Sequence, residues 1–158
     1  MEVFGKFWGI ILGFILIFIC PIYLTEIRIK SLIDIETVNL VDRFLDKIKY
    51  TGYIDREELD NFYLSVSKIT SDKELKILHK RRAVRPIFKD GNVTDTKEFY
   101  IEVADEEIKE ELKSRNKYQL KIGDEICCVI KDREKLLNIF PKKTIELGGM
   151  IENEWIKN

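Results

Sequence analysis

The chain has 158 residues, 45% hydrophobic and 35% charged, and its 27 basic and 28 acidic side chains give a formal net charge of −1. This length holds one modest domain, and a charge balance near zero does not favour a nucleic-acid binder, whose surface is generally basic. Three cysteines with no CxxC pair among them do not indicate a zinc or redox site. We therefore expect no nucleic acid among the partners.

The first predicted element is an apolar helix in the stretch GKFWGIILGFILIFICPIYL, residues 5–24. The eighteen residues from Phe7 to Leu24 carry no formal charge, and twelve of them are Ile, Leu or Phe. A helix of that length is about 27 Å long, close to the ~30 Å hydrocarbon core of a bilayer. No small-residue cleavage pattern follows, so we expect an uncleaved transmembrane anchor over residues 1–24, not a removed signal peptide. Pro21 is expected to bend this helix by removing one backbone hydrogen bond.

Three glycines recur at four-residue spacing in the anchor. Gly5, Gly9 and Gly13 fall on one helix face, because four residues advance by about 400°. Without side chains there, two helix backbones can approach closely in a membrane. We expect this face to pack on a like helix or on a partner's helix. The predicted partners are therefore membrane lipid and either a second copy or another transmembrane helix.

The next segment continues the helical spacing of apolar residues, now with charged residues between them. This pattern predicts an amphipathic helical stalk of two helices over residues 25–69. The first helix is expected to end at Gly52, and Asp55 is expected to cap the second. Basic residues stand on both sides of the anchor, so charge does not decide which side of the membrane the rest occupies.

Residues 70–158 are predicted to form the head domain. Asp105 is expected to cap a short helix that continues through Leu112, a second short helix is expected from Arg133 to Phe140, and KDGN at 89–92 indicates a turn. The predicted strands are ELKILHKRRAVRPIF, the segment of alternating Phe99, Ile101 and Val103, YQLKIGDEICCVIK with a turn or bulge at its Gly-Asp pair, and TIELGGMI. The predicted fold class is α+β: a transmembrane helix that continues into a long amphipathic helix, then a small, mostly antiparallel sheet with short helices.

The sequence shows little that indicates chemistry. His79, the one histidine, lies in the basic run HKRRAVR with no acid nearby in sequence, so we expect an exposed strand histidine and not a catalytic one. Cys127 and Cys128 are adjacent, so they are expected to point to opposite faces of a strand as buried free thiols. We therefore predict no catalytic residue, no metal site, no cofactor and a protein that is not an enzyme.

The basic run is the one local excess of charge. Lys80, Arg81, Arg82 and Arg85 could contact an anionic surface of lipid or polymer. They could instead be outward side chains that face acidic neighbours across the sheet. We favour the second interpretation.

The chain resembles a known group of envelope proteins. The segments GKFWGIILGFILIFICPIYL, FLDKIKYTGYIDREELDNF and IELGGMI are similar to pilin-like and TadE-like pseudopilin subunits, and to an uncharacterised group of small clostridial single-pass membrane proteins from mobile-element or pilus-like loci. Ile10 stands where pilin signals have a glutamate. The resemblance implies a structural subunit of a cell-envelope assembly or of a secretion or conjugation apparatus, with its head domain outside the cytoplasm. The alternative is a membrane-tethered binding or regulatory module that uses its basic strand to contact an anionic surface.

Overall fold

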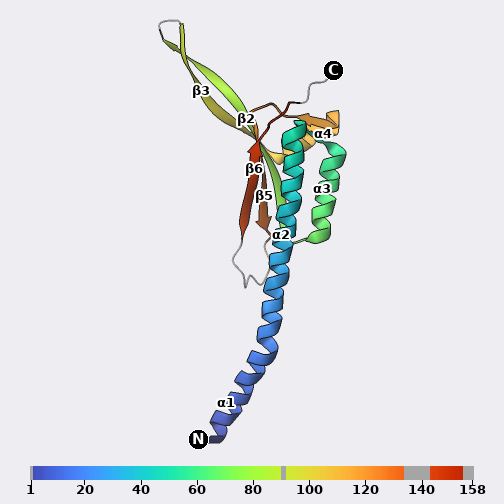
Figure 1. Ribbon diagram of the computed structural model, residues 1–158, viewed down its shortest axis with the longest axis vertical. Helices are drawn as coiled ribbons and strands as arrows, with labels where there is room; N and C mark the ends of the chain where they lie inside the picture. Colours follow the sequence, from blue (N-terminus) through green and yellow to red (C-terminus); the bar gives the residue numbers. More distant parts are fainter. Residues whose placement is uncertain (1, 90–91, 134–142, 155–158) are drawn as a thin grey trace. The chain divides into compact units, whose positions relative to one another are not determined.

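The computed structural model describes residues 2–89, 92–133 and 143–154 (Figure 1). By their internal contacts, residues 1–38 and residues 39–158 form two separate units. The fold is α+β, as the sequence predicts: a long N-terminal apolar helix precedes a small antiparallel sheet and short helices.

The N-terminal part of the chain is helical throughout its described length. Helix α1 spans Glu2–Phe14, a π-helical turn η1 spans Ile15–Ile19, and helix α2 spans Cys20–Thr51. In η1 the N–H of Cys20 donates to the carbonyl of Ile15, five residues earlier. Pro21 follows directly and has no N–H to donate. A wide turn of this kind is one way in which a helix accommodates a lost backbone hydrogen bond.

The end of α2 follows the sequence prediction. Gly52 has a positive φ of 71°, and its N–H donates to the carbonyl of Ile48 at 2.9 Å. A glycine in the left-handed region directly after the last helical residue is a common helix stop, because it has no Cβ to clash there.

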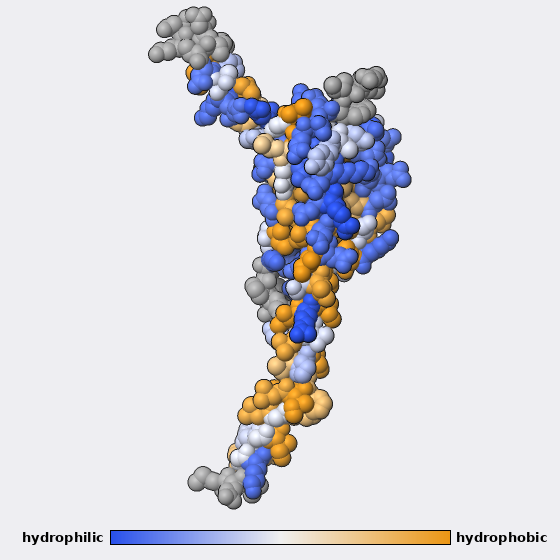
Figure 2. Space-filling model, in the orientation of Figure 1, coloured by the Kyte–Doolittle hydropathy of each residue, from blue (hydrophilic) through white to orange (hydrophobic). Residues whose placement is uncertain are grey.

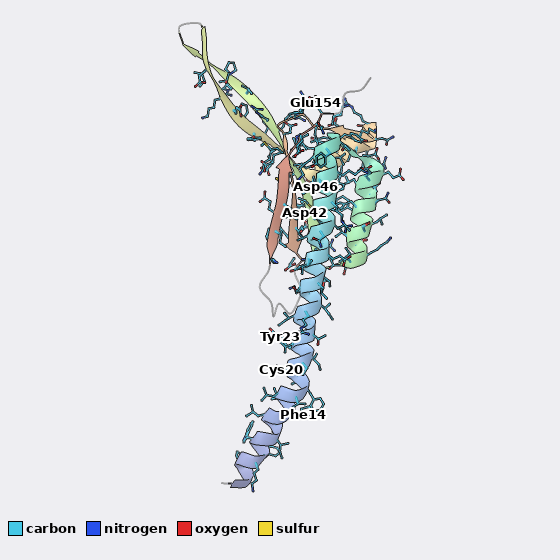
Figure 3. The ribbon with its side chains drawn as sticks, in the orientation of Figure 1. Phe14, Cys20, Tyr23, Asp42, Asp46 and Glu154 are labelled. Carbon is cyan, nitrogen blue, oxygen red and sulfur yellow. The ribbon has the colours of Figure 1, made fainter. Side chains whose placement is uncertain are left out.

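Residues 39–51 of α2 belong with the sheet and not with the anchor. Val41 and Leu45 are buried, whereas Asp42 and Asp46 are exposed (Figure 3). The 3.6-residue period of a helix produces this alternation when one side faces a core.

Helix α3 packs beside this part of α2. Strand β1, Tyr53–Asp55, leads into α3, Arg56–Ile69, and the Asp55 side chain caps α3 by accepting from the N–H of Glu57 at 3.0 Å. The rings of Phe44 and Phe62 stack with their centroids 4.1 Å apart. Residues 53–69 therefore share the core of the unit formed by residues 39–158.

The main sheet has four antiparallel strands in the order β3-β2-β5-β6. The strands are β2, Lys73–Lys89; β3, Asn92–Val103; β5, Glu125–Asp132; and β6, Thr144–Met150. Strand β2 is the longest, and β5 pairs with it only from Lys73 to Lys80. Beyond Lys80, β2 and β3 continue as a two-stranded arm that extends past β5 (Figure 1).

A second, two-stranded sheet pairs β1 with β4, Lys117–Gln119. The stretch YQLKIGDEICCVIK forms two strands, and the turn or bulge predicted at its Gly-Asp pair is a turn that separates them. In this turn the N–H of Asp124 donates to the carbonyl of Lys121 at 3.0 Å. Gly123 has a φ of 86° in this turn, which is the position where a type II turn requires a glycine.

Helix α4 spans Asp105–Arg115, and its N-cap is Ala104 and not the predicted Asp105. The Asp105 carboxylate accepts instead from the Tyr63 hydroxyl at 3.1 Å and the N–H of Ile77 at 3.4 Å, and it pairs with Lys109. Tertiary partners thus use the side chain that could otherwise cap the helix. The predicted helix from Arg133 to Phe140 lies outside the described residues, apart from Arg133 itself.

Candidate functional site

The first candidate surface is the apolar helix. The helix from Phe4 to Thr51 is 48 residues long, and its first part is apolar enough to cross a membrane. The consecutive side chains from Ile15 to Ile19 are all exposed, so apolar groups surround the helix on every side. Figure 2 shows this hydrophobic surface along the helix, and Figure 3 shows Phe14, Cys20 and Tyr23 on it. Contact of such a surface with water is unfavourable, whereas contact with the hydrocarbon tails of lipids is favourable.

The glycine face lies on α1, before the π-helical turn. A Cβ atom built on Gly5, Gly9 or Gly13 meets nothing within 4 Å. The chain itself therefore gives no steric reason for glycine at these positions, although glycine costs about 1 kcal/mol relative to alanine inside a helix.

The basic run is divided between the two faces of the arm, because successive strand residues point to opposite sides. Lys80 and Arg82 share one face. The Lys80 amine lies 3.6 Å from a carboxylate oxygen of Glu125 and 3.7 Å from one of Glu146, and Arg82 pairs with Glu98. These two cations face acidic neighbours across the sheet, as the favoured interpretation expects.

Arg81 and Arg85 lie on the other face of the arm. Burial raises the pKa of the Tyr118 phenol, and the positive charge of Arg81 opposes this shift. The Arg85 guanidinium lies 5.9 Å from the centroid of the Phe99 ring. Both arginines are exposed. The four basic residues therefore do not form one surface.

His79 is buried, so the prediction of an exposed histidine is wrong. Its side chain is 1% exposed and lies between Tyr118 and Asp124. The ring Nδ1 is 2.7 Å from the Tyr118 hydroxyl, and Nε2 is 3.0 Å from Oδ2 of Asp124. Asp124 is 45 residues away in sequence, and the turn between β4 and β5 brings it to the ring.

The Asp124 carboxylate also holds backbone groups. Its Oδ1 accepts from the N–H of Arg82 at 2.8 Å, and its Oδ2 accepts from the N–H of Lys121 at 3.0 Å. A carboxylate that accepts these bonds also accepts from His79, so the proton lies on Nε2 and Tyr118 donates to Nδ1. The cluster joins the base of the arm to the turn that precedes β5.

Burial lowers the pKa of His79 below its ordinary value, although the nearby Asp124 carboxylate opposes this effect. The neutral imidazole is thus the form that fits the folded protein. Because His79, Tyr118 and Asp124 are all nearly inaccessible to solvent, this geometry is that of an internal hydrogen-bond network that fixes strand β2 in place. The pair Gly123-Asp124 marks a turn in the sequence, but nothing in the sequence indicates that this turn contacts His79.

The two adjacent cysteines are free and buried, as the sequence predicts. They point to opposite faces, since Cys128 is opposite Ile77 and Cys127 is opposite Leu78. Burial raises the pKa of the Cys127 thiol to about 11 and that of Cys128 to about 12. Both thiols are protonated at neutral pH and are therefore weak nucleophiles.

Among the described residues, no group of three or more His, Cys, Asp or Glu side chains is arranged to hold a metal ion. Comparisons with protein-family models, with curated proteins and with solved structures gave no match to this chain. The resemblance to pilin-like subunits remains a prediction. The surfaces that carry a functional argument are therefore the apolar helix and the β2–β3 arm.

Proposed function

We propose that the protein is a non-enzymatic, single-pass membrane protein that serves as a structural subunit of a cell-envelope assembly or of a secretion or conjugation apparatus. The observation that carries this proposal is the apolar helix, whose side chains are exposed on all sides between Phe4 and Leu24. A helix of this kind gains stability in lipid, where its backbone polar groups are already paired within the helix.

The glycine face supports the assembly part of the proposal. No contact within the chain requires glycine at Gly5, Gly9 or Gly13. Small residues at this spacing let two membrane helices pack closely. Self-association or packing on a partner's transmembrane helix uses this face.

The first prediction tests this face. Replacing Gly9 and Gly13 with leucine is expected to preserve membrane insertion, because the helix becomes more hydrophobic, and to abolish helix association in a membrane two-hybrid assay. The matched control is Phe7→Leu with Ile11→Leu, which changes the opposite side of the same helix and is expected to leave association intact. Equal association of the two double variants would contradict the role of the glycines.

The second prediction concerns the side of the membrane, for which the resemblance to pilin-like subunits supports an extracytoplasmic head. Buried Cys127 and Cys128 are poor targets for labelling, so a new thiol is needed. In a Cys20→Ala background, Ser114→Cys at an exposed position of α4 is expected to react with a membrane-impermeant maleimide in intact cells. Labelling that occurs only after lysis places the head in the cytoplasm.

One observation favours the alternative function as a second candidate. Arg81 and Arg85 lie on one exposed face of the arm, and no ion pair joins either of them to an acid among the described residues. A membrane-tethered binding module whose arm contacts an anionic surface has this geometry.

A further inference from the structure

The β2–β3 arm has two open edges over most of its length. From Arg81 onward β2 pairs only with β3, because its pairing with β5 ends at Lys80. Strand β3 is the outermost strand of the sheet. A two-stranded ribbon is only marginally stable in water, and an open strand edge presents N–H and C=O groups to other chains. On the β2 edge, the N–H of Arg82 is already bonded to Asp124.

The two edges differ in how well they are protected. The free edge of β2 contains Pro86, which has no N–H to donate, together with Arg81 and Arg85. The edge strand β3 instead contains three consecutive apolar residues, Phe99, Tyr100 and Ile101, which are 39, 47 and 48% exposed. Strand β3 also has charged residues, such as Lys97 and Glu98, but it has no proline, so every residue of this strand keeps its backbone N–H. We therefore take β3 as the edge on which a partner strand can form a continuous ladder of backbone hydrogen bonds.

The charges on one face of the arm indicate the chemistry of that partner. Arg85 is directly opposite Lys97, and this like-charged pair is unfavourable in the free protein. Arg81 and Arg85 share this face with Phe99 and Ile101, whereas on the other face Arg82 is already paired with Glu98. Asp95, opposite Ile87, also lies on the first face, where its one carboxylate does not balance three cations. Among the described residues, no ion pair joins Arg85 or Lys97 to an acid. A carboxylate brought to this face relieves the repulsion.

We propose that an extended segment of a partner protein adds antiparallel to the open edge of β3, with an acidic side chain opposite Lys97 and apolar side chains opposite Phe99 and Ile101. Backbone hydrogen bonds to β3 supply affinity, and the alternating side chains supply specificity. This inference rests on the second candidate function, since it names the anionic surface that the arm contacts. It does not depend on the glycine face.

The experiment uses the full chain in nanodiscs of zwitterionic lipid and fluorescently labelled synthetic peptides. The probe Thr-Val-Tyr-Val-Thr-Glu places its glutamate opposite Lys97 when it adds antiparallel to β3. We expect saturable binding by fluorescence anisotropy, and about fivefold weaker binding when the last residue is lysine, as one surface ion pair allows. A peptide with proline in place of tyrosine lacks a backbone donor and is expected not to bind.

Two variants of the protein make the test reciprocal. Lys97→Glu is expected to reverse the preference, so that the lysine-ended peptide binds more tightly than the glutamate-ended one. Lys113→Glu, an exposed change on α4, leaves the preference unaltered. The proposal is overturned if Lys97→Glu does not change the preference or if the proline peptide binds equally well. It is also overturned if the protein does not bind the peptides but binds phosphatidylglycerol vesicles, and if the double variant Arg81→Glu with Arg85→Glu loses this vesicle binding. In that last case the second candidate function survives with lipid as its partner. If the protein binds neither the peptides nor the vesicles, the second candidate function is contradicted too.

Discussion

At the base of the arm, one imidazole ring is held between a phenol and a carboxylate. The contacts from His79 to Tyr118 and Asp124 satisfy both ring nitrogens, so a buried polar side chain is accommodated without an unpaired group. The same arrangement makes protonation of the ring unfavourable, because the buried imidazolium is poorly solvated and its Nδ1 would no longer accept from Tyr118.

This residue gives the third prediction, on pH. Burial lowers the pKa of His79 in the folded protein, so the unfolded chain binds a proton first as the pH falls. The contribution of this group to stability is therefore complete above about pH 7 and decreases as the pH falls below about 6.5, by at most about 1.4 kcal/mol per pH unit. Thermal unfolding of the wild type between pH 7.5 and 5.5 is expected to show this decrease. His79→Gln, which cannot titrate, is expected to be less stable at pH 7.5 but to have a flatter pH profile. An unchanged slope in the variant would assign the pH dependence to other groups.

At the scale of elements, strand β6 approaches β5 closely at a glycine. A Cβ atom on Gly148 would lie 2.6 Å from Sγ of Cys127 and 2.8 Å from the carbonyl oxygen of Ile126. A Cβ atom on Gly149 would instead lie 2.8 Å from Cδ of Lys49, within a flexible side chain that can move. Neighbouring glycines in one strand thus face different constraints.

The fourth prediction uses this difference. Gly148→Ala is expected to lower the free energy of unfolding by about 1–3 kcal/mol, as overpacking against backbone generally does. Gly149→Ala is expected to cost clearly less. The measurement is denaturant unfolding of the full chain in detergent, followed by circular dichroism. Equal losses in the two variants would show that strand β6 can shift away from β5.

The sequence predicts elements whose signals are local. The stop at Gly52, the cap at Asp55 and the strand that includes His79 follow from residue preferences and periodicity. The environment of His79 could not be predicted, because it depends on a turn 45 residues away. The predicted capping role of Asp105 is wrong for a similar reason, since distant partners in the fold use its carboxylate instead. Side chains whose roles depend on distant contacts are the ones that sequence patterns do not place.

At the scale of the whole molecule, the two units differ in the solvent to which they are suited. Residues 4–24 expose apolar side chains on every side, whereas in the unit formed by residues 39–158 apolar side chains such as Ile77, Ile126 and Ile130 are fully buried. The second unit has its own core and needs no lipid to bury it. The apolar helix, which is long and apolar enough to cross a membrane, is therefore the part of the chain for which the proposed membrane anchoring is needed.

The π-helical turn at Ile15–Ile19 changes the phase of the apolar helix. Each residue of an α-helix advances by about 100°, so the extra residue held in one π-turn rotates all later side chains by about that angle. The face of Gly5, Gly9 and Gly13 therefore does not continue as the same face of α2. A straight partner helix can follow it only along the 13 residues of α1, about 20 Å. Past Ile19 such a partner meets a different strip of side chains, which leaves the second half of the span to lipid or to another helix.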